Sequence, residues 1–433
     1  MRRLLRLAGS RNDLLIVQRE VSRRFEASRI LREEDGRKVV LMEKVGSSKL
    51  PLVGNLLCRR EYLLYALNIH SYNEAYEALL RAMNNPLPPE ITEPPQMEKL
   101  TGGLDDLPAL YFYEKDGGPY ITSAVFVARD PEYGFQNASI HRVMVRGPRE
   151  AVVRIVPRHL YRMLKKAEKR GETLPVAVVI GADPIYYIAA ATSPPYGVDE
   201  LYVANTLSNG RMQAFEEPET GLIIPSDAEV VITGELSPFE SAPEGPFVDI
   251  TGTYDIVRSQ PVLKVKNVYA RPGALFYAIL PAGLEHKLLM GFSREAAIWD
   301  SVRRVVPDVK AVRLTPGGCG WLHAVISIRK QKEGDAKNAI LAALAAHPSL
   351  KLAIVVDEDI NVDDPNDVEW AIATRFQPHK DLVIITGARG SSLDPSADQK
   401  LLLTSKWGID ATKPLNEPEE NYTKAIIPSY EAD

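Results

Sequence analysis

The chain has 433 residues, more than one hydrophobic core usually organises, so two or three domains are expected. Hydrophobic residues make up 45% of the chain and charged residues 25%, a balance that excludes a disordered protein. The net charge of −5 gives no reason to expect nucleic acid as a partner, and no run of about 18 apolar residues predicts a membrane span.

The first part of the chain, residues 1–95, is predicted to be a small α/β unit. Residues 39–42 indicate a strand, and residues 60–83 have the periodicity of a helix. A proline-rich stretch at 86–95 then interrupts both helices and inner strands. We therefore expect a domain boundary near residue 95.

Residues 96–305 contain mostly short apolar runs separated by turn residues, a pattern typical of β structure. The clearest strands are predicted at 120–127, 176–181 and 229–233. One helix is predicted over 159–170, ending at Gly171. The pattern favours a split-barrel-like domain with inserted helices.

Residues 306–433 change to α/β alternation, which predicts a third domain. Helices are expected at 335–346 and 368–374, and strands at 352–357 and 382–386. The glycine-dense segment 317–320 precedes a strand and not a helix, so a turn is a better interpretation than a phosphate cradle. The fold class as a whole is predicted to be mixed α/β.

Three polar segments of the central domain could carry chemistry, although each also has an ordinary explanation. The run from Asn137 to Arg142 combines an amide, a hydroxyl, an imidazole and a guanidinium, yet it could be a solvated strand. His159 stands at a helix N-terminus, which favours anions, but it could simply cap the helix. Glu244 and Asp249 flank a Gly-Pro turn: such a pair can hold one proton and one charge, or form an ordinary acidic turn.

Taken together, these segments resemble the UbiD family of reversible non-oxidative decarboxylases. The similarity extends over residues 55–412. Beyond the three segments above, it rests on several further motifs in the family's order: Val178-Val179-Ile180-Gly181-Ala182-Asp183-Pro184, Asp199-Glu200-Leu201, Thr251-Gly252, Val356-Asp357-Glu358-Asp359-Ile360, Trp370-Ala371-Ile372-Ala373-Thr374-Arg375 and Gly408-Ile409-Asp410-Ala411-Thr412.

The resemblance implies a prenylated flavin mononucleotide (FMN), held by its phosphate through a divalent metal, usually manganese, with a potassium ion nearby. Asn137, His159 and Glu200 match the family's metal positions, and their oxygen and nitrogen donors suit such an ion. Carbonyls of residues 189–192 are expected to hold the potassium. The other positions matching cofactor contacts are Ala138, Ser139, Ile140, Arg142, Arg158 and Lys351.

The resemblance also implies a catalytic trio of Arg142, Glu244 and Asp249, in which aspartate at the third position is a familiar variant of glutamate. Asp249 is the expected proton donor. Arg142 is expected to bind the substrate carboxylate or tune the acids, and Glu244 to hold Arg142 in place. Val248 replaces a glycine that is common between the two acids, which predicts a narrower space beside the flavin.

The implied reaction removes CO2 from an unsaturated carboxylic acid, with the cofactor as electron sink because no side chain is a good one. Among the family's substrates we favour anhydromevalonate phosphate, giving isopentenyl phosphate in archaeal isoprenoid biosynthesis. The alternative is 4-hydroxy-3-polyprenylbenzoate in quinone biosynthesis, or another aromatic acid. Two other classes stay open: a flavin carrier, which would need no acid pair, and a metal-dependent hydrolase, which would need an open metal position.

The partners that follow are a small carboxylic acid, a flavin prenyltransferase that supplies the cofactor, and further copies of this chain. The C-terminal domain is expected to support a homo-oligomer, with a dimer as the minimum. The two cysteines, Cys58 and Cys319, form neither a metal-ligand pair nor a disulfide framework. This favours a reducing compartment, the cytoplasm.

Overall fold

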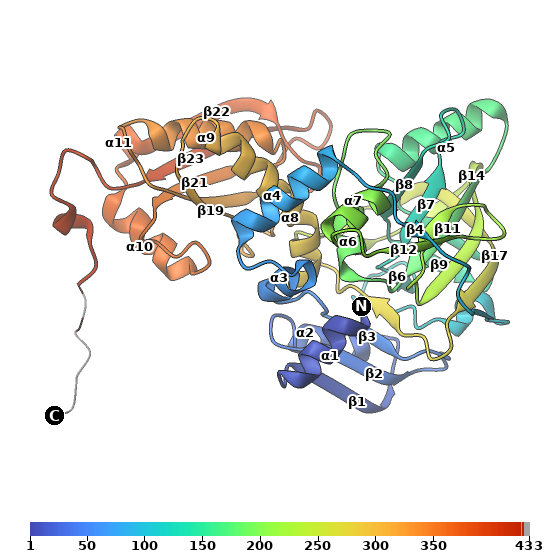
Figure 1. The fold of residues 1–433 in the computed structure, drawn as a ribbon. Coiled ribbons are helices and arrows are strands. Elements are labelled where there is room, and N and C mark those ends of the chain that lie inside the picture. Colours follow the sequence, from blue (N-terminus) through green and yellow to red (C-terminus); the bar gives the residue numbers. More distant parts are fainter. Residues whose placement is uncertain (426, 428–433) are drawn as a thin grey trace, which may run out of the picture. The chain divides into compact units, whose positions relative to one another are not determined.

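The computed structural model describes residues 1–425 and 427 of the chain, which folds into two compact units, Met1–Ser293 and Arg294–Asp433. Both units combine helices and sheets (Figure 1), so the prediction of a mixed α/β fold is confirmed. Among the described residues, no helix is long and apolar enough to span a membrane.

The first unit begins with a four-stranded sheet in the order β1-β2-β3-β18. Three of its strands come from the N-terminal segment, whereas β18 comes from much later in the chain. Strand β2 contains the predicted strand, and the apolar residues at its start are fully buried. The elements of this part are α1 (Arg2–Ser10), β1 (Leu14–Val21), α2 (Glu26–Glu33), β2 (Val39–Val45), β3 (Leu52–Gly54) and β18 (Phe276–Ala278).

The periodic segment 60–83 is not one helix, as its pattern suggested, but two: α3 (Arg60–Leu67) and α4 (Tyr72–Asn84). The break lies at Asn68, which has a left-handed φ of 57° and ends α3. Asparagine tolerates this conformation well, so the periodicity alone could not reveal the interruption. Ser71 then caps α4 by accepting a hydrogen bond from the Glu74 N–H.

The centre of the first unit is a nine-stranded sheet in which every paired strand is antiparallel. Its order is β6-β9-β10-β17-β14-β11-β7-β8, and β5 also pairs with β17. The strands are β5 (Glu98–Lys99), β6 (Tyr120–Ile121), β7 (Val125–Arg129), β8 (Gln136–Ile140), β9 (Val143–Gly147), β10 (Glu150–Val153), β11 (Leu174–Ile180), β14 (Val230–Glu244) and β17 (Arg258–Ala270).

The expected continuous strand over 120–127 is wrong, since residues 122–124 separate β6 from β7. Here the chain leaves the sheet and bonds to a distant segment. The hydroxyl of Thr122 accepts from the Ile279 N–H, and Ser123 donates to the Tyr277 carbonyl. The strand predicted at 229–233 is the start of the much longer β14.

Two smaller sheets and three further helices also belong to this unit. Strands β13 (Ile223–Pro225), β12 (Gln213–Glu216) and β4 (Glu90–Ile91) form one sheet, and β15 (Phe247–Val248) pairs with β16 (Tyr254–Asp255) in the other. Helix α5 (His159–Arg170) has the predicted bounds. It buries apolar residues at helical spacing and ends at Gly171, whose φ of 73° favours glycine. The other helices are α6 (Pro184–Ala190) and α7 (Glu200–Leu207).

The second unit is a five-stranded sheet in the order β19-β20-β21-β23-β22. Helix α9 packs on one face, where a Cβ on Gly408 would lie 2.2 Å from Ile340 of that helix. Helix α10 packs on the other face through Val368 and Ala371. The bounds are α8 (Leu284–Arg303, which begins in the first unit), β19 (Val309–Leu314), β20 (His323–Ile328), α9 (Asp335–Ala346), β21 (Leu352–Asp357), α10 (Pro365–Arg375), α11 (Pro378–Asp381), β22 (Leu382–Arg389) and β23 (Leu403–Ala411).

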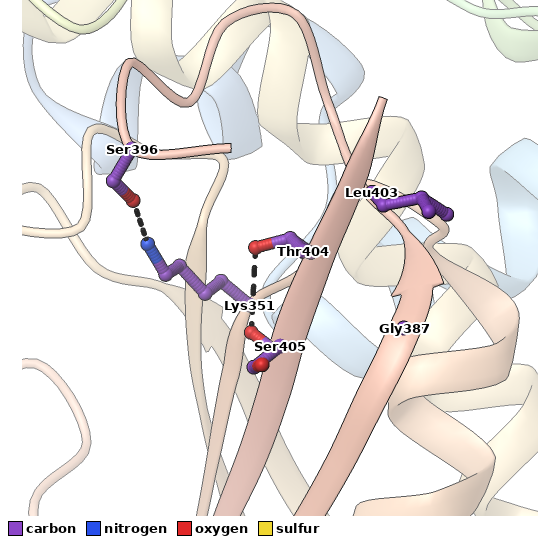
Figure 2. A pocket seen from close by; sticks show the side chains of 6 residues that line it. All are labelled: Lys351, Gly387, Ser396, Leu403, Thr404 and Ser405. Carbon is purple, nitrogen blue, oxygen red and sulfur yellow. Dashed lines mark hydrogen bonds between the residues drawn. The ribbon is translucent and has the colours of Figure 1, made fainter. Parts of the chain in front are cut away.

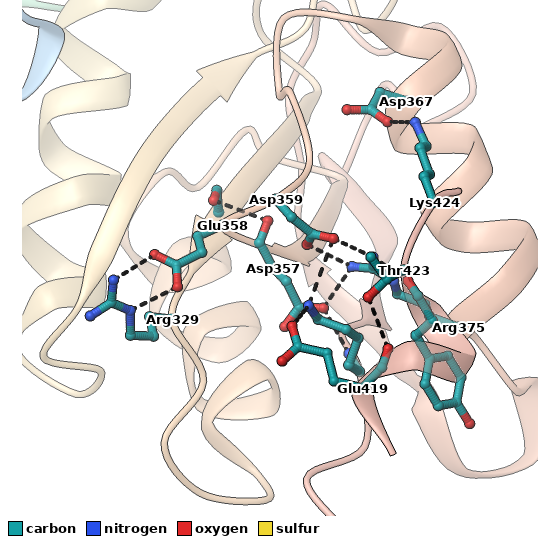
Figure 3. Close-up of polar contacts among 12 residues, drawn as sticks. Arg329, Asp357, Glu358, Asp359, Asp367, Arg375, Glu419, Thr423 and Lys424 are labelled. Carbon is teal, nitrogen blue, oxygen red and sulfur yellow. Dashed lines mark hydrogen bonds and ion pairs between the residues drawn. The ribbon is translucent and has the colours of Figure 1, made fainter. Parts of the chain in front are cut away.

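The predictions for this unit are largely correct: α9 and β21 have the predicted bounds, and residues 317–320 form a turn before β20. The similarity motifs 356–360 and 370–375 meet in an ion cluster around the buried Arg375 (Figure 3). Arg375, whose side chain is fully buried, donates at 2.7 Å to Asp357 and at 2.7 Å to Asp359. This cluster joins the end of α10 to the end of β21, a structural role.

Replacing Arg375 by alanine is expected to destabilise the protein by about 3–5 kcal/mol, because Asp357 would be left buried without its guanidinium partner. Urea unfolding monitored by circular dichroism would measure the change. The matched control is Arg329→Ala, which removes an exposed arginine that pairs with Glu358 at 2.8 Å (Figure 3) and should change the stability far less, because water screens an exposed ion pair. Equal effects of the two substitutions would contradict the assignment.

Candidate active site

The predicted trio is assembled around Arg142, which lies in the turn between β8 and β9. Its Nε donates to Glu244 Oε1 at 2.9 Å and its Nη2 to Glu244 Oε2 at 2.9 Å, a two-pronged contact. Its Nη1 lies 3.5 Å from Asp249 Oδ2. The structure therefore brings together all three residues proposed to act in catalysis.

Glu244 is the anchor of this cluster: it ends β14 and is fully buried. Besides Arg142, it accepts a hydrogen bond of 2.9 Å from the hydroxyl of Tyr120 in β6. Burial, and then the Glu244 carboxylate, raise the pKa of Tyr120, so its phenol keeps its proton and donates it. The Arg142 guanidinium also lies over the Phe247 ring, 5.0 Å from the ring centre.

Asp249 follows β15 and is more open, with a side chain 25% exposed against 0% for Glu244. Exposure suits a group that must reach a substrate. The turn between the two acids requires glycine at Gly245, whose φ is 97°. Gly117 rests on this turn, where a Cβ would lie 2.1 Å from the Gly245 carbonyl oxygen. Val248 is buried in β15, at the position where the resemblance predicts a narrower space.

Asp255, in β16, belongs to the same cluster, and the sequence did not reveal it. Its Oδ2 lies 3.1 Å from Arg142 Nη2 and 3.5 Å from Arg154 Nε, and its Oδ1 accepts from Arg258 at 3.0 Å. Burial would raise the pKa of Asp255, but the hydrogen bond from Arg258 and the charge of Arg142 hold it below its ordinary value. The pairing of β15 with β16 places Asp255 opposite Phe247, and so brings its carboxylate to the site.

A second polar cluster joins β8 to the N-terminus of α7. Glu200, the first residue of α7, is buried and accepts 2.7 Å hydrogen bonds from the Asn137 amide and the Ala138 N–H. Ser139 donates to Asn137 Oδ1 at 3.2 Å, while Ile140 pairs with β7. Two of the three predicted metal ligands, Asn137 and Glu200, are therefore in contact.

The third predicted ligand, His159, begins α5 and forms no hydrogen bond with Asn137 or Glu200 among the described residues. Its ring packs edge-on against Tyr196, with the ring centres 5.1 Å apart. Burial, then the charge of Arg158, lowers the pKa of His159, which favours the neutral, ligating imidazole. The Arg158 guanidinium donates to Ser193 at 3.3 Å, and burial lowers its pKa.

The buried carboxyl group of Glu200 is compatible with a bound cation. No lysine or arginine of the described residues pairs with it, and burial raises its pKa well above the ordinary value. A group of three or more His, Cys, Asp or Glu side chains able to hold a metal does not occur within residues 1–425 and 427. One carboxylate, one imidazole and one amide therefore need further oxygen ligands, which a phosphate can supply.

The remaining predicted positions, Lys351 and residues 189–192, make hydrogen bonds of their own. Lys351 belongs to the second unit, where its ammonium lies 2.9 Å from Asp394 and donates to Ser396 in a surface hollow beside Thr404 and Ser405 (Figure 2). The proposed potassium-binding carbonyls lie at the end of α6, where the Ala189 carbonyl already accepts from the N–H and the hydroxyl of Thr192.

Three domain profiles match the chain: the N-terminal, Rift-related and C-terminal domains of 3-octaprenyl-4-hydroxybenzoate carboxy-lyase, over residues 5–83, 90–284 and 287–411. A protein named anhydromevalonate phosphate decarboxylase from Methanothermobacter thermautotrophicus is 47% identical over 94% of this chain and 96% of its own. The solved UbiD-class enzyme HmfF from Pelotomaculum thermopropionicum, in complex with FMN, is 38% identical, with a TM-score of 0.95 over 99% of this chain and 97% of its own.

An evolved dimeric form of HmfF in complex with prenylated FMN (prFMN) is 36% identical, with a TM-score of 0.91 over 99% of this chain and 96% of its own. Fold and site thus define an α/β protein of the carboxy-lyase class, with a barrel-like central sheet that carries an arginine–carboxylate cluster. The chain belongs to the UbiD family. The family resemblance found in the sequence, and the decarboxylase class that it implied, are confirmed.

Proposed function

We propose that this protein is a prenylated-FMN-dependent decarboxylase that converts anhydromevalonate phosphate to isopentenyl phosphate. The observation that carries the proposal is the Arg142–Glu244–Asp249 cluster, which sets one buried, paired carboxylate beside one accessible carboxyl. The choice of substrate is supported by the name of the M. thermautotrophicus relative, which matches the chain over nearly its whole length.

The residues of the second cluster would hold the cofactor. Asn137, His159 and Glu200 would bind a divalent ion such as manganese together with the flavin phosphate, while Arg158 and Ser139 would contribute polar contacts. Carbonyls of residues 189–192 would hold a potassium ion, and Ala138, Ile140 and Lys351 would contact the cofactor. When bound, the prenylated flavin supplies the electron sink that decarboxylation requires.

The chain's own contribution is charge placement and proton transfer. Arg142 orients the acid substrate by its charge, and Glu244 fixes the guanidinium through two hydrogen bonds of 2.9 Å. Asp249 delivers a proton to the carbon that has lost CO2. Its partial exposure leaves a path by which the proton can be replaced from solvent.

The test is a comparison of two acids with the purified, cofactor-loaded protein. CO2 release from anhydromevalonate phosphate, and little from 4-hydroxy-3-polyprenylbenzoate, is the expected result. The reverse preference would transfer the assignment to quinone biosynthesis. Flavin binding without CO2 release from any acid would identify a flavin carrier. A purified protein without flavin absorbance would favour the remaining alternative, a metal-dependent hydrolase.

We further propose that the protein acts as a homo-oligomer, assembled through residues 306–433, and that it receives its cofactor from a flavin prenyltransferase. An evolved form of HmfF is dimeric, which supports a dimer as the minimum unit. The three-domain division at residues 95 and 305 and a cytoplasmic location belong to the same proposal. Both cysteines are free thiols, as a reducing compartment requires.

Light scattering across micromolar concentrations is expected to give a mass of at least twice the 48.0 kDa of one chain. Substitution of exposed residues within 306–433 should lower the measured mass if these residues form the interface. A mass near that of one chain at every concentration would contradict the oligomer.

A further inference from the structure

Three guanidinium groups converge on the single carboxylate of Asp255. Arg142 and Arg154 approach its Oδ2, and Arg258 donates to its Oδ1. The arginines are held together by the backbone as well: the Arg154 N–H donates to the Arg142 carbonyl at 3.1 Å, and Arg258 is paired with Glu244 across β14 and β17. The group therefore lies directly beside the catalytic trio.

Arg154 and Arg258 both have N–H groups without a close acceptor among the described residues. The nearest acceptors of Arg154 are 3.5 Å away, at Asp255 and at the Ile155 carbonyl, and its Nη2 donates to no described residue. The Nε of Arg258 is buried and has no partner among the described residues. A half-buried guanidinium normally finds acceptors for its donors, so unused donors at this point indicate that an acceptor is supplied by a ligand.

The charge balance of the cluster supports the same conclusion. Arg142, Arg154 and Arg258 face the carboxylates of Glu244, Asp249 and Asp255. In the protonation state that the reaction requires, Asp249 holds a proton, so these three guanidinium groups face two charged carboxylates, and Asp116 is a further carboxyl group near Arg142. Burial, together with repulsion from Arg142 and Arg258, lowers the pKa of Arg154, as expected for a guanidinium whose charge is incompletely neutralised.

We propose that Arg154 and Arg258, bridged by Asp255, form an anion subsite that binds the phosphate of a phosphorylated acid substrate. The inference rests on the proposed function, and it explains how one site could hold a molecule with two anionic ends. The carboxylate would lie at Arg142 and the phosphate at Arg154 and Arg258. A guanidinium fork suits phosphate oxygens, with which it forms charge-assisted hydrogen bonds.

The same chemistry could serve the phosphate of the flavin, so the test must separate two phosphate sources. Cofactor-loaded wild type, Arg154→Gln and Arg258→Gln would be titrated by calorimetry with anhydromevalonate phosphate and with the same acid lacking its phosphate. Flavin content would be measured by absorbance in each protein. The control is Arg146→Gln, which removes an exposed arginine of β9 that pairs with Glu150 at 3.5 Å.

We expect Arg154→Gln to weaken binding of the phosphorylated acid about tenfold to a hundredfold, the usual effect of losing charged hydrogen bonds. Arg258→Gln should weaken it in the same direction. Binding of the unphosphorylated acid should change less than about twofold, flavin content should stay unchanged, and Arg154→Lys should restore part of the loss. Arg146→Gln should bind both acids as wild type does.

Three results would overturn the subsite. Equal loss for both acids would mean that Arg154 merely supports Arg142 through Asp255. Loss of flavin would assign the phosphate contact to the cofactor, and unchanged binding would mean that the donors serve no ligand. Wild type that binds the phosphorylated acid but releases no CO2 would refute the proposed reaction and leave the subsite standing, so the two failures are distinguishable.

Discussion

Replacing Asp249 by asparagine is expected to lower turnover by at least about two orders of magnitude, the usual contribution of a general acid. Asparagine keeps the size of the side chain but has no acidic proton to transfer. Flavin binding should stay normal, because Asp249 lies in the arginine cluster and not among the residues around Glu200. CO2 release by the cofactor-loaded protein, with flavin absorbance as the loading standard, measures both effects.

Two comparisons sharpen this result. Glu240→Gln removes an exposed carboxylate of β14 that pairs with Lys264 at 2.9 Å, and it should leave turnover unchanged. Arg142→Ala should also inactivate the protein, but partly through weaker substrate binding, and therefore with a higher KM. Near-normal CO2 release by Asp249→Asn would exclude Asp249 as the acid and leave Glu244 as the candidate.

The fold was predictable wherever one element has a clear period and a defined end. Helix α5 shows apolar residues at helical spacing and a glycine stop, and β21 is an unbroken apolar run, so both were placed correctly. The failures came where a single residue changes the backbone direction without changing the pattern. Asn68 ends α3 inside a periodic segment, and Thr122 and Ser123 leave the sheet for partners about 155 residues away.

The candidate site was predictable from the sequence only in part. The polar segments around Asn137, His159 and Glu244 were visible, but nothing in their spacing indicated that Glu244 would meet Arg142, 102 residues away. That pairing was inferred from the family resemblance. Asp255 was missed, because its role depends on the pairing of two short strands, β15 and β16, which no local pattern predicts.

The two polar clusters differ in how their buried charge is neutralised. Glu244 is matched by Arg142, an ion pair that is complete within the protein. Among the described residues, Glu200 accepts hydrogen bonds from the Asn137 amide and from backbone N–H groups, none of which carries a full charge. A carboxylate left in this state costs free energy until a cation arrives, so the first cluster is complete before a ligand binds and the second is not.

Replacing Glu200 by glutamine is therefore expected to weaken flavin binding without lowering the stability of the cofactor-free protein. The variant should lose most of its bound flavin, because the proposed metal would lose its only carboxylate ligand among the three predicted residues. The cofactor-free protein should be at least as stable as wild type, since the free-energy cost of burying or protonating an unpaired carboxylate has been removed. Flavin absorbance, metal content and thermal unfolding measure these effects.

The matched control for this prediction is Glu229→Gln, because Glu229 is also buried in the first unit but pairs with Arg2 at 2.6 Å. That variant should lose stability and keep its flavin, the reverse of Glu200→Gln. His159→Ala should behave like Glu200→Gln towards the flavin if its imidazole is a ligand, although in the described part of the chain His159 forms no hydrogen bond with Asn137 or Glu200. Full flavin occupancy in Glu200→Gln would refute the metal assignment, because the assignment makes the Glu200 carboxylate a ligand of the proposed ion.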